Sequence, residues 1–169
     1  MESNRVYTVA FPWSARVWII TSLYFLFAVV LISLLIYTMV AGGIVGGIVG
    51  LVIALPILLG IVFYCEGYSP QRLEISSSAI TVLRRYDSVT IPNSIILDIT
   101  SLSSKDMSWT VSAGGCGGLF GYFGTFSNRR LGQFTMYATT KKNLFLIRTA
   151  DGKSVVISCS EPKVMQKIV

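Results

Sequence analysis

Few residues in this sequence could do chemistry, and the most suggestive group is the glycine-rich segment 114–124, GGCGGLFGYFG. Glycine-rich loops can bind phosphate through free backbone N–H groups. A P-loop would end in Lys-Ser or Lys-Thr and open a helix, and a dinucleotide site would need a strand, a helix and a later acid. Neither pattern is present, so the segment does not indicate a nucleotide site.

The same segment is rich in aromatic side chains and is followed by an arginine pair. We expect a flexible loop with an apolar tip that contacts the membrane interface or a protein partner. The alternative is that these side chains pack onto the domain, while the glycines allow tight turns with positive φ. The candidate contact residues are Leu119, Phe120, Tyr122, Phe123, Phe126, Arg129 and Arg130.

Other catalytic and metal-binding groups are scarce. The sequence contains no histidine, which excludes Ser-His-Asp and Cys-His centres and the commonest zinc ligand. Cys65, Cys116 and Cys159 are too far apart in sequence for a C-x-x-C motif, and their odd number favours a reducing compartment. We therefore expect no enzymatic activity, no metal and no cofactor, with the three cysteines acting as inert packing residues.

A long uncharged stretch dominates the first part of the chain. Residues 17–65 contain no Asp, Glu, Lys or Arg, and the mean hydropathy of the whole chain is +0.67. A membrane helix needs about 20 apolar residues, so this stretch is long enough for two spans. We predict a transmembrane hairpin over 17–64, with helices at about 17–39 and 43–64, after a cytoplasmic segment over 1–16.

The basic residues around the hairpin predict its orientation. Arg5 and Arg16 precede the first span, Arg72, Arg84 and Arg85 follow the second, and the turn between the spans is uncharged. Because Lys and Arg accumulate on the cytoplasmic side of membranes, both termini should be cytoplasmic. We expect a multi-pass protein of the inner (cytoplasmic) membrane, in contact with the lipid bilayer.

Small residues recur along the second predicted span. Gly42, Gly46, Gly50 and Ala54 are spaced by four, so they would share one helix face. Small faces let helices approach closely in lipid. The stripe would pack against the first span, or it would build a homo-oligomer or bind a protein partner.

After residue 65 the pattern changes to short β-rich runs separated by turn residues. Ser76, Ser77 and Ser78 form one predicted hairpin turn, and the Asp151-Gly152 pair marks another. Ser160 and Pro162 predict the start of a closing helix. The predicted strands are 72–75, 80–84, 89–91, 95–99, 133–140, 144–148 and 155–157.

Residues 65–169 resemble the bacterial pleckstrin-homology-like (PH-like) domains. The resemblance rests on YSPQRLEISSSAITVLRR, on TIPNSIILDI, on the glycine-phenylalanine run 117–126 and on the Glu161-Pro162 transition into the closing helix. It implies an α+β membrane protein in which the hairpin precedes a seven-stranded, partly open β-barrel with one C-terminal helix. It also implies a protein- or lipid-facing module without catalysis.

The resemblance does not extend to phosphoinositide recognition. Phosphoinositide-reading members of the wider superfamily carry several Lys and Arg in the first hairpin loop, whereas this loop is Ser76-Ser77-Ser78. We therefore expect no specific phosphoinositide binding.

The domain is basic, with 12 Lys and Arg against 7 Asp and Glu over 65–169. Such a domain below an anionic leaflet would be attracted to the bilayer. The alternative is that these are ordinary solvated charges. Nucleic-acid binding is not expected, because the aromatic residues cluster in the spans and the glycine-rich segment. The candidate basic surface is Arg84, Arg85, Lys141 and Lys142.

These observations predict a non-catalytic, membrane-anchored interaction or scaffold module that faces the cytoplasm. The alternative function is an accessory subunit of a membrane enzyme or transporter, which recognises its partner through the glycine-rich second span.

Overall fold

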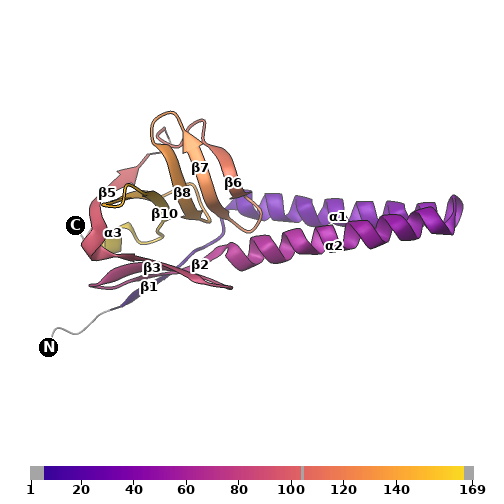
Figure 1. Ribbon diagram of the computed structural model, residues 1–169, viewed down its shortest axis with the longest axis horizontal. Coiled ribbons are helices and arrows are strands. Elements are labelled where there is room, and N and C mark those ends of the chain that lie inside the picture. Colours follow the sequence, from indigo (N-terminus) through magenta and orange to yellow (C-terminus); the bar gives the residue numbers. More distant parts are fainter. Residues whose placement is uncertain (1–5, 104, 166–169) are drawn as a thin grey trace.

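The computed structural model of the chain describes residues 6–103 and 105–165. Two long helices lie side by side and project from one end of a β-rich domain (Figure 1). Arg5, on which the predicted orientation partly depends, lies outside the described residues, as do residues 166–169 at the end of the predicted closing helix.

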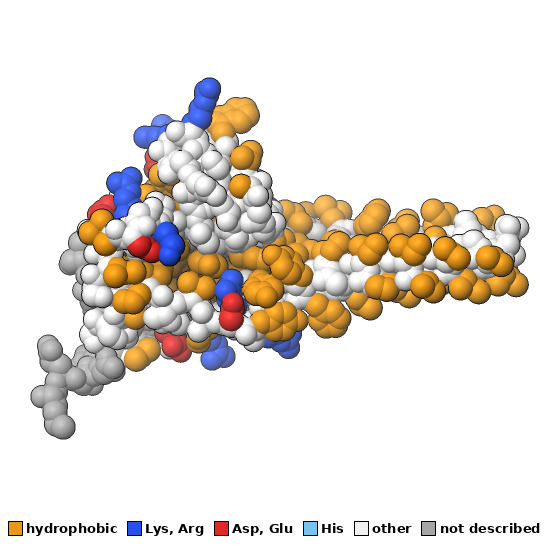
Figure 2. Space-filling model, viewed as in Figure 1, with side chains coloured by type: hydrophobic (Ala, Val, Ile, Leu, Met, Phe, Trp, Pro, Cys, Tyr) orange, Lys and Arg blue, Asp and Glu red, His pale blue; other side chains and the backbone are white. Residues whose placement is uncertain are grey.

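The hairpin consists of α1 (Ala15–Ala41) and α2 (Ile44–Tyr68), each long and apolar enough to cross a membrane. Both helices extend past the predicted spans on the side of the domain. Ser14 caps α1, because its side chain accepts a hydrogen bond from the backbone N–H of Val17 at 3.4 Å. Apolar side chains cover the hairpin, while Lys, Arg, Asp and Glu gather on the domain (Figure 2). This distribution is consistent with a membrane anchor.

The two helices approach closely at glycines of α2. A Cβ atom at Gly47 would lie 2.4 Å from the Cβ of Met39, and one at Gly50 would lie 2.7 Å from a methyl group of Leu35. Nearer the domain, the Tyr24 hydroxyl donates a hydrogen bond to the carbonyl of Leu58 at 2.7 Å. Small residues therefore allow tight packing in the outer half of the hairpin, as in other membrane helix pairs.

The first sheet contains four antiparallel strands in the order β1-β2-β3-β4. Ser76 closes the β2–β3 turn, because its side chain accepts a hydrogen bond from the backbone N–H of Ala79 at 3.0 Å. The β1 strand was not predicted from sequence. The strands are β1 (Tyr7–Ala10), β2 (Pro70–Ile75), β3 (Ala79–Arg84) and β4 (Ser88–Pro92).

The second sheet has six strands in the order β5-β9-β10-β8-β7-β6, and only the β10–β8 pair is parallel. A short 3-10 helix, η1 (Asn93–Ile95), leads from the first sheet into the second. The strands are β5 (Ile96–Leu102), β6 (Val111–Gly117), β7 (Tyr122–Asn128), β8 (Gly132–Ala138), β9 (Leu144–Thr149) and β10 (Ser154–Ser158).

The core lies between the sheets. Leu73 and Ile80 of the first sheet share one cluster with Ile147 and Ile157 of the second, and all four side chains are almost completely buried. The described part of the closing helix, α3 (Pro162–Met165), places Met165 in the same cluster. The predicted α+β architecture with a C-terminal helix is therefore present.

The strand count differs from the predicted seven. All seven predicted strands are present, but the described residues form ten strands in two sheets and no closed barrel. β1 is added because the segment before α1 pairs with β2, which buries Val9 opposite Leu73. β6 and β7 are added because the glycine-rich segment folds into a hairpin.

Candidate functional site

The helical hairpin contacts the domain at the turn between β6 and β7. The backbone N–H of Phe120 donates a hydrogen bond to the side chain of Thr21 in α1 at 3.2 Å. The Ser69 hydroxyl, at the end of α2, donates to the carbonyl of the same Phe120 at 2.7 Å. The Phe120 ring packs edge to face with Trp13, with 5.6 Å between centroids. Both helices thus contact the domain through hydrogen bonds to the β6–β7 turn.

This arrangement corrects the expectation of a flexible loop with an exposed apolar tip. The five apolar contact candidates are at most 9% exposed, because β7 is an interior strand of the second sheet and the turn is covered by the helices. Gly118 and Gly121 adopt φ values of +138° and +156°, which permit the tight turn. The segment therefore agrees with the alternative prediction, in which these side chains pack onto the domain and the glycines allow tight turns. The buried residues are Leu119, Phe120, Tyr122, Phe123 and Phe126.

The arginine pair predicted to accompany these side chains lies elsewhere. Arg129 and Arg130 are at the β7–β8 turn, at the end of β7 away from the hairpin, and are exposed. Arg130 forms a salt bridge with Asp106 at 2.7 Å. The structure therefore does not bring the aromatic candidates and the arginine candidates into one site.

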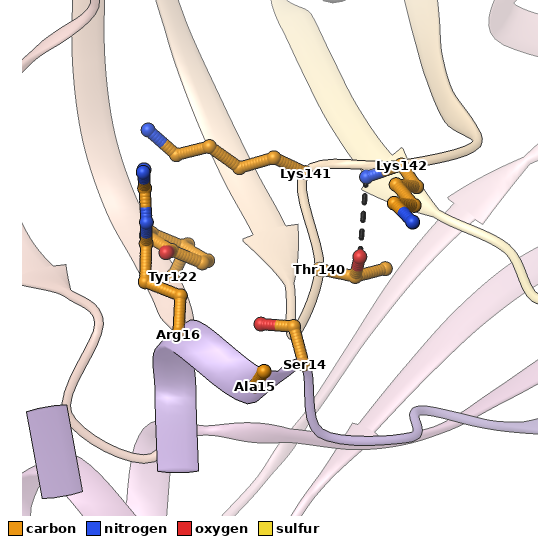
Figure 3. Close-up of a pocket in the computed structure, with 7 residues that line it drawn as sticks. All are labelled: Ser14, Ala15, Arg16, Tyr122, Thr140, Lys141 and Lys142. Atoms are coloured by element: carbon orange, nitrogen blue, oxygen red, sulfur yellow. Dashed lines mark hydrogen bonds between the residues drawn. The ribbon is translucent and has the colours of Figure 1, made fainter. Parts of the chain in front are cut away.

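A pocket lies where α1 begins (Figure 3). Its volume is about 570 Å³, which falls in the range typical of small-molecule sites. Three segments far apart in sequence build it: the start of α1, the start of β7 and the loop after β8. The lining residues are Ser14, Ala15, Arg16, Tyr122, Thr140, Lys141 and Lys142.

Positive charge dominates this pocket. Arg16, Lys141 and Lys142 line it, and no acidic residue does. The side chains of Arg16 and Lys141 extend toward each other, while Lys142 points away (Figure 3). Desolvation lowers the pKa of Lys141, and the positive charge of Arg16 lowers it further. The ammonium of Lys141 also lies 5.3 Å from the centre of the Tyr122 ring, in cation–π geometry.

The other half of the predicted basic surface is already neutralised. Arg84 forms a salt bridge with Asp87 at 2.6 Å, and Arg85 pairs with Glu66. Among the described residues, no salt bridge involves Lys141 or Lys142. The four candidates therefore form two separate pairs, of which only Lys141 and Lys142 line the pocket.

The predicted small-residue stripe is divided between two environments. Gly50 packs against Leu35 of α1, and Ala54 is partly buried. A Cβ atom at Gly46 would meet nothing within 4 Å, and Gly42 is exposed near the hairpin turn. The hairpin therefore uses part of the stripe and leaves Gly46 on an open face.

The fold also brings together two cysteines that their sequence spacing had not connected. A side-chain hydrogen bond with Cys65 lowers the pKa of Cys116 to about 7, against the opposing effect of burial. The backbone N–H groups of Leu119, Gly118 and Gly117 lower it further. Among the three cysteines, Cys116 is the one whose lowered pKa favours a reactive thiolate, although its thiol also donates a hydrogen bond to the carbonyl of Leu119 at 3.1 Å.

Trp109 is a second feature that sequence reasoning missed. Its side chain is 91% exposed, just before the edge strand β6, where Val111 is 62% exposed. A large exposed aromatic side chain next to a free strand edge is typical of protein contacts. In sequence, Trp109 carried no signal beyond its residue type.

In the parts of the chain that the structure describes, no three His, Cys, Asp or Glu side chains cluster closely enough to hold a metal ion.

Comparison with known proteins identifies the domain. A family model described as "Bacterial PH domain" matches residues 71–168, which is more than half of the chain. No curated protein and no solved structure matches the chain.

Proposed function

Because the chain belongs to the bacterial PH domain family, we propose that it is a non-catalytic interaction module held at the cytoplasmic face of the inner membrane by its two-helix hairpin. One observation carries this proposal. The two exposed apolar helices form a hairpin whose second helix, α2, runs directly into the family domain, with only Ser69 between α2 and β2. Phe120 donates a hydrogen bond to Thr21 of α1 and accepts one from Ser69 at the end of α2, and these bonds would hold the domain close to the bilayer.

The charge distribution supports cytoplasmic termini. Arg16 lies at the start of α1, and Arg72, Arg84 and Arg85 follow α2, whereas the hairpin turn carries no charge. The positive-inside rule then orients the domain toward the cytoplasm. On this assignment the chain divides into a cytoplasmic segment (1–16), a membrane hairpin (17–64) and a cytoplasmic domain (65–169).

The partner surface that we favour is the region of Trp109 and the β6 edge, because the aromatic side chains of the β6–β7 turn are buried. A protein segment that pairs with β6 would cover a free strand edge and the Trp109 side chain together. The β7–β8 turn lies next to this surface, because Arg130 forms a salt bridge with Asp106 in the loop that carries Trp109.

A second candidate function rests on Gly46. Its open face would let another membrane helix approach closely, as an accessory subunit of a membrane enzyme or transporter would require. A second copy of the chain could use the same face.

Photo-cross-linking in intact membranes tests the two functions. One photoreactive residue replaces Trp109, and another replaces Gly46, with Gly60 as the control because it is also open to the outside of α2. Cross-links from Trp109 to one defined protein support the interaction module. Cross-links from Gly46 alone support the accessory subunit. If all three positions reach only lipid, both proposals fail.

A further inference from the structure

We propose that the pocket at the start of α1 binds the phosphate of an anionic lipid headgroup through Arg16, Lys141 and the hydroxyl of Tyr122. The inference rests on the proposed function, which places the hairpin in a membrane, and it adds a specific ligand to that function. It also differs from a general attraction of a basic domain to the bilayer, because it depends on three side chains at one place.

Charge is the first argument. Arg16 and Lys141 extend toward each other, although like charges repel (Figure 3). Within the described residues, salt bridges involve Arg84, Arg85, Arg130 and Lys153, and none involves a base of the pocket. An anion between Arg16 and Lys141 would relieve this repulsion through charge-assisted hydrogen bonds.

The start of α1 is the second argument. The first turn of this 27-residue helix contains no acidic residue, so no side chain balances the positive end of the helix dipole. The Ser14 side chain is engaged with the N–H of Val17, but the N–H groups before it have no partner within the helix. Helix starts of this kind bind phosphate.

Tyr122 supplies an independent observation. Its side chain is 3% exposed, and its hydroxyl is buried with no partner in good hydrogen-bond geometry. Burial raises the pKa of this hydroxyl, and the Arg16 guanidinium lies near enough to interact with it and to lower the pKa against this effect. The hydroxyl faces the side of the pocket where Arg16 lies (Figure 3). Buried hydroxyl groups are rarely left unpaired, because the loss of hydrogen bonds to water is costly. A phosphate oxygen would accept a hydrogen bond from this hydroxyl.

The position of the pocket indicates a lipid as the source of the phosphate. Trp18, one turn into α1, is 59% exposed and packs edge to face with Trp13, at 4.8 Å between ring centroids. Tryptophan accumulates where a membrane helix passes the headgroups. Arg16 therefore lies at the depth of the lipid phosphates, with the pocket open beside it.

Native mass spectrometry of the full chain in detergent tests this inference. The chain is titrated with dioleoylphosphatidylglycerol, with dioleoylphosphatidylcholine and with inorganic phosphate. The test variants are the pair Arg16→Gln and Lys141→Gln, and separately Tyr122→Phe. The pair Lys105→Gln and Arg129→Gln is the matched control, because it removes the same charge from exposed positions outside the pocket. Thermal unfolding establishes that each variant is folded.

We expect the unchanged chain to prefer phosphatidylglycerol over phosphatidylcholine. The pocket pair should weaken phosphatidylglycerol binding about tenfold, and Tyr122→Phe about fivefold, whereas the control pair should bind like the unchanged chain. The Tyr122→Phe result still decides the question if the pocket pair fails to fold.

Three results would overturn the inference. The first is equal binding of phosphatidylglycerol and phosphatidylcholine, and the second is an equal loss of phosphatidylglycerol binding in the control pair. The third is displacement of the lipid by inorganic phosphate at the same concentration, which would make the ligand a soluble phosphate. Extraction of cell membranes with alkaline carbonate separates this inference from the proposed function. Release of the chain would contradict the membrane anchor, whereas the detergent titration reports on the pocket alone.

Discussion

Thr21 in α1 accepts a hydrogen bond from the backbone N–H of Phe120 at 3.2 Å, although the two residues are 99 positions apart in sequence. The carbonyl of Phe120 is held from the other side by Ser69 at the end of α2. Both polar groups of one peptide segment are thereby satisfied by the two helices. The hairpin fixes the orientation of the domain, because the connection is a buried hydrogen-bonded contact and not a flexible linker.

Thr21→Val should therefore destabilise the junction of hairpin and domain. The substitution keeps the shape of the side chain but leaves the buried N–H of Phe120 unpaired, at a cost of about 1–3 kcal/mol. Chemical unfolding of the detergent-solubilised chain measures this cost. Thr38→Val is the matched control, because the Thr38 hydroxyl bonds within α1 at an exposed position and its loss should change stability by less than about 0.5 kcal/mol. Equal effects of the two variants would contradict the proposed role of Thr21.

Local turn signals explain which parts of the fold could be predicted. The β2–β3 turn at Ser76 and the β9–β10 turn at Gly152 are where the sequence placed them, because short-range hydrogen bonding and a positive φ determine such turns. β1 was missed because it has one buried apolar residue, Val9, and forms only by pairing with the distant β2. The sequence predicts a loop for the glycine-rich segment because glycine has low β propensity, whereas pairing with β8 overrides that propensity in the structure.

The packing of the hairpin gives a second prediction. Gly47→Leu should destabilise the chain by about 1–3 kcal/mol, because its Cβ atom would lie 2.4 Å from the Cβ of Met39 and the helices would have to separate. Gly60→Leu, on the same helix but in open space, should leave stability nearly unchanged. Thermal unfolding in one detergent compares the two variants. If Gly60→Leu is equally harmful, the effect comes from the larger side chain in α2 and not from the contact with α1.

The candidate site was less accessible to sequence reasoning than the fold. Lys141 and Lys142 were singled out, but only as part of a surface with Arg84 and Arg85, because sequence does not show that Asp87 and Glu66 pair with those arginines. Tyr122 is a sequence candidate for its apolar character, whereas the role proposed for it in the pocket depends on its buried hydroxyl. The pairing of Arg85 with Glu66 and the burial of the Tyr122 hydroxyl both depend on contacts between residues that are far apart in sequence.

Asn128 gives a third prediction, concerning the loop that carries Trp109. Its side chain is buried, donates to the carbonyl of Asp106 at 2.9 Å and accepts from the backbone N–H of Leu131 at 2.7 Å. Asn128→Ala should cost about 1–3 kcal/mol and loosen the loop before β6, because these backbone groups lose their partners. Hydrogen exchange over 105–110 should then be faster.

Gln133→Ala is the control for this loop, because Gln133 is exposed on the neighbouring strand β8. It should leave hydrogen exchange over 105–110 unchanged. Unchanged exchange in Asn128→Ala as well would show that other contacts hold the Trp109 loop.

The reactivity of Cys116 gives the last prediction. Its thiol has a pKa of about 7, lowered first by the hydrogen bond with Cys65, whereas a free cysteine has a pKa of about 8.5. Because the thiolate is the reactive form, the rate of alkylation by iodoacetamide should rise through pH 7 and level off above pH 8. Cys65→Ala removes the largest cause of the lowered pKa, so the inflection should move to higher pH. Cys159→Ala is the control and should leave the Cys116 profile unchanged, because burial raises the pKa of Cys159 and keeps it protonated. Peptide mass spectrometry after timed labelling follows each cysteine separately. An inflection near pH 8.5 in the unchanged chain would show that Cys65 and the surrounding N–H groups do not stabilise the Cys116 thiolate.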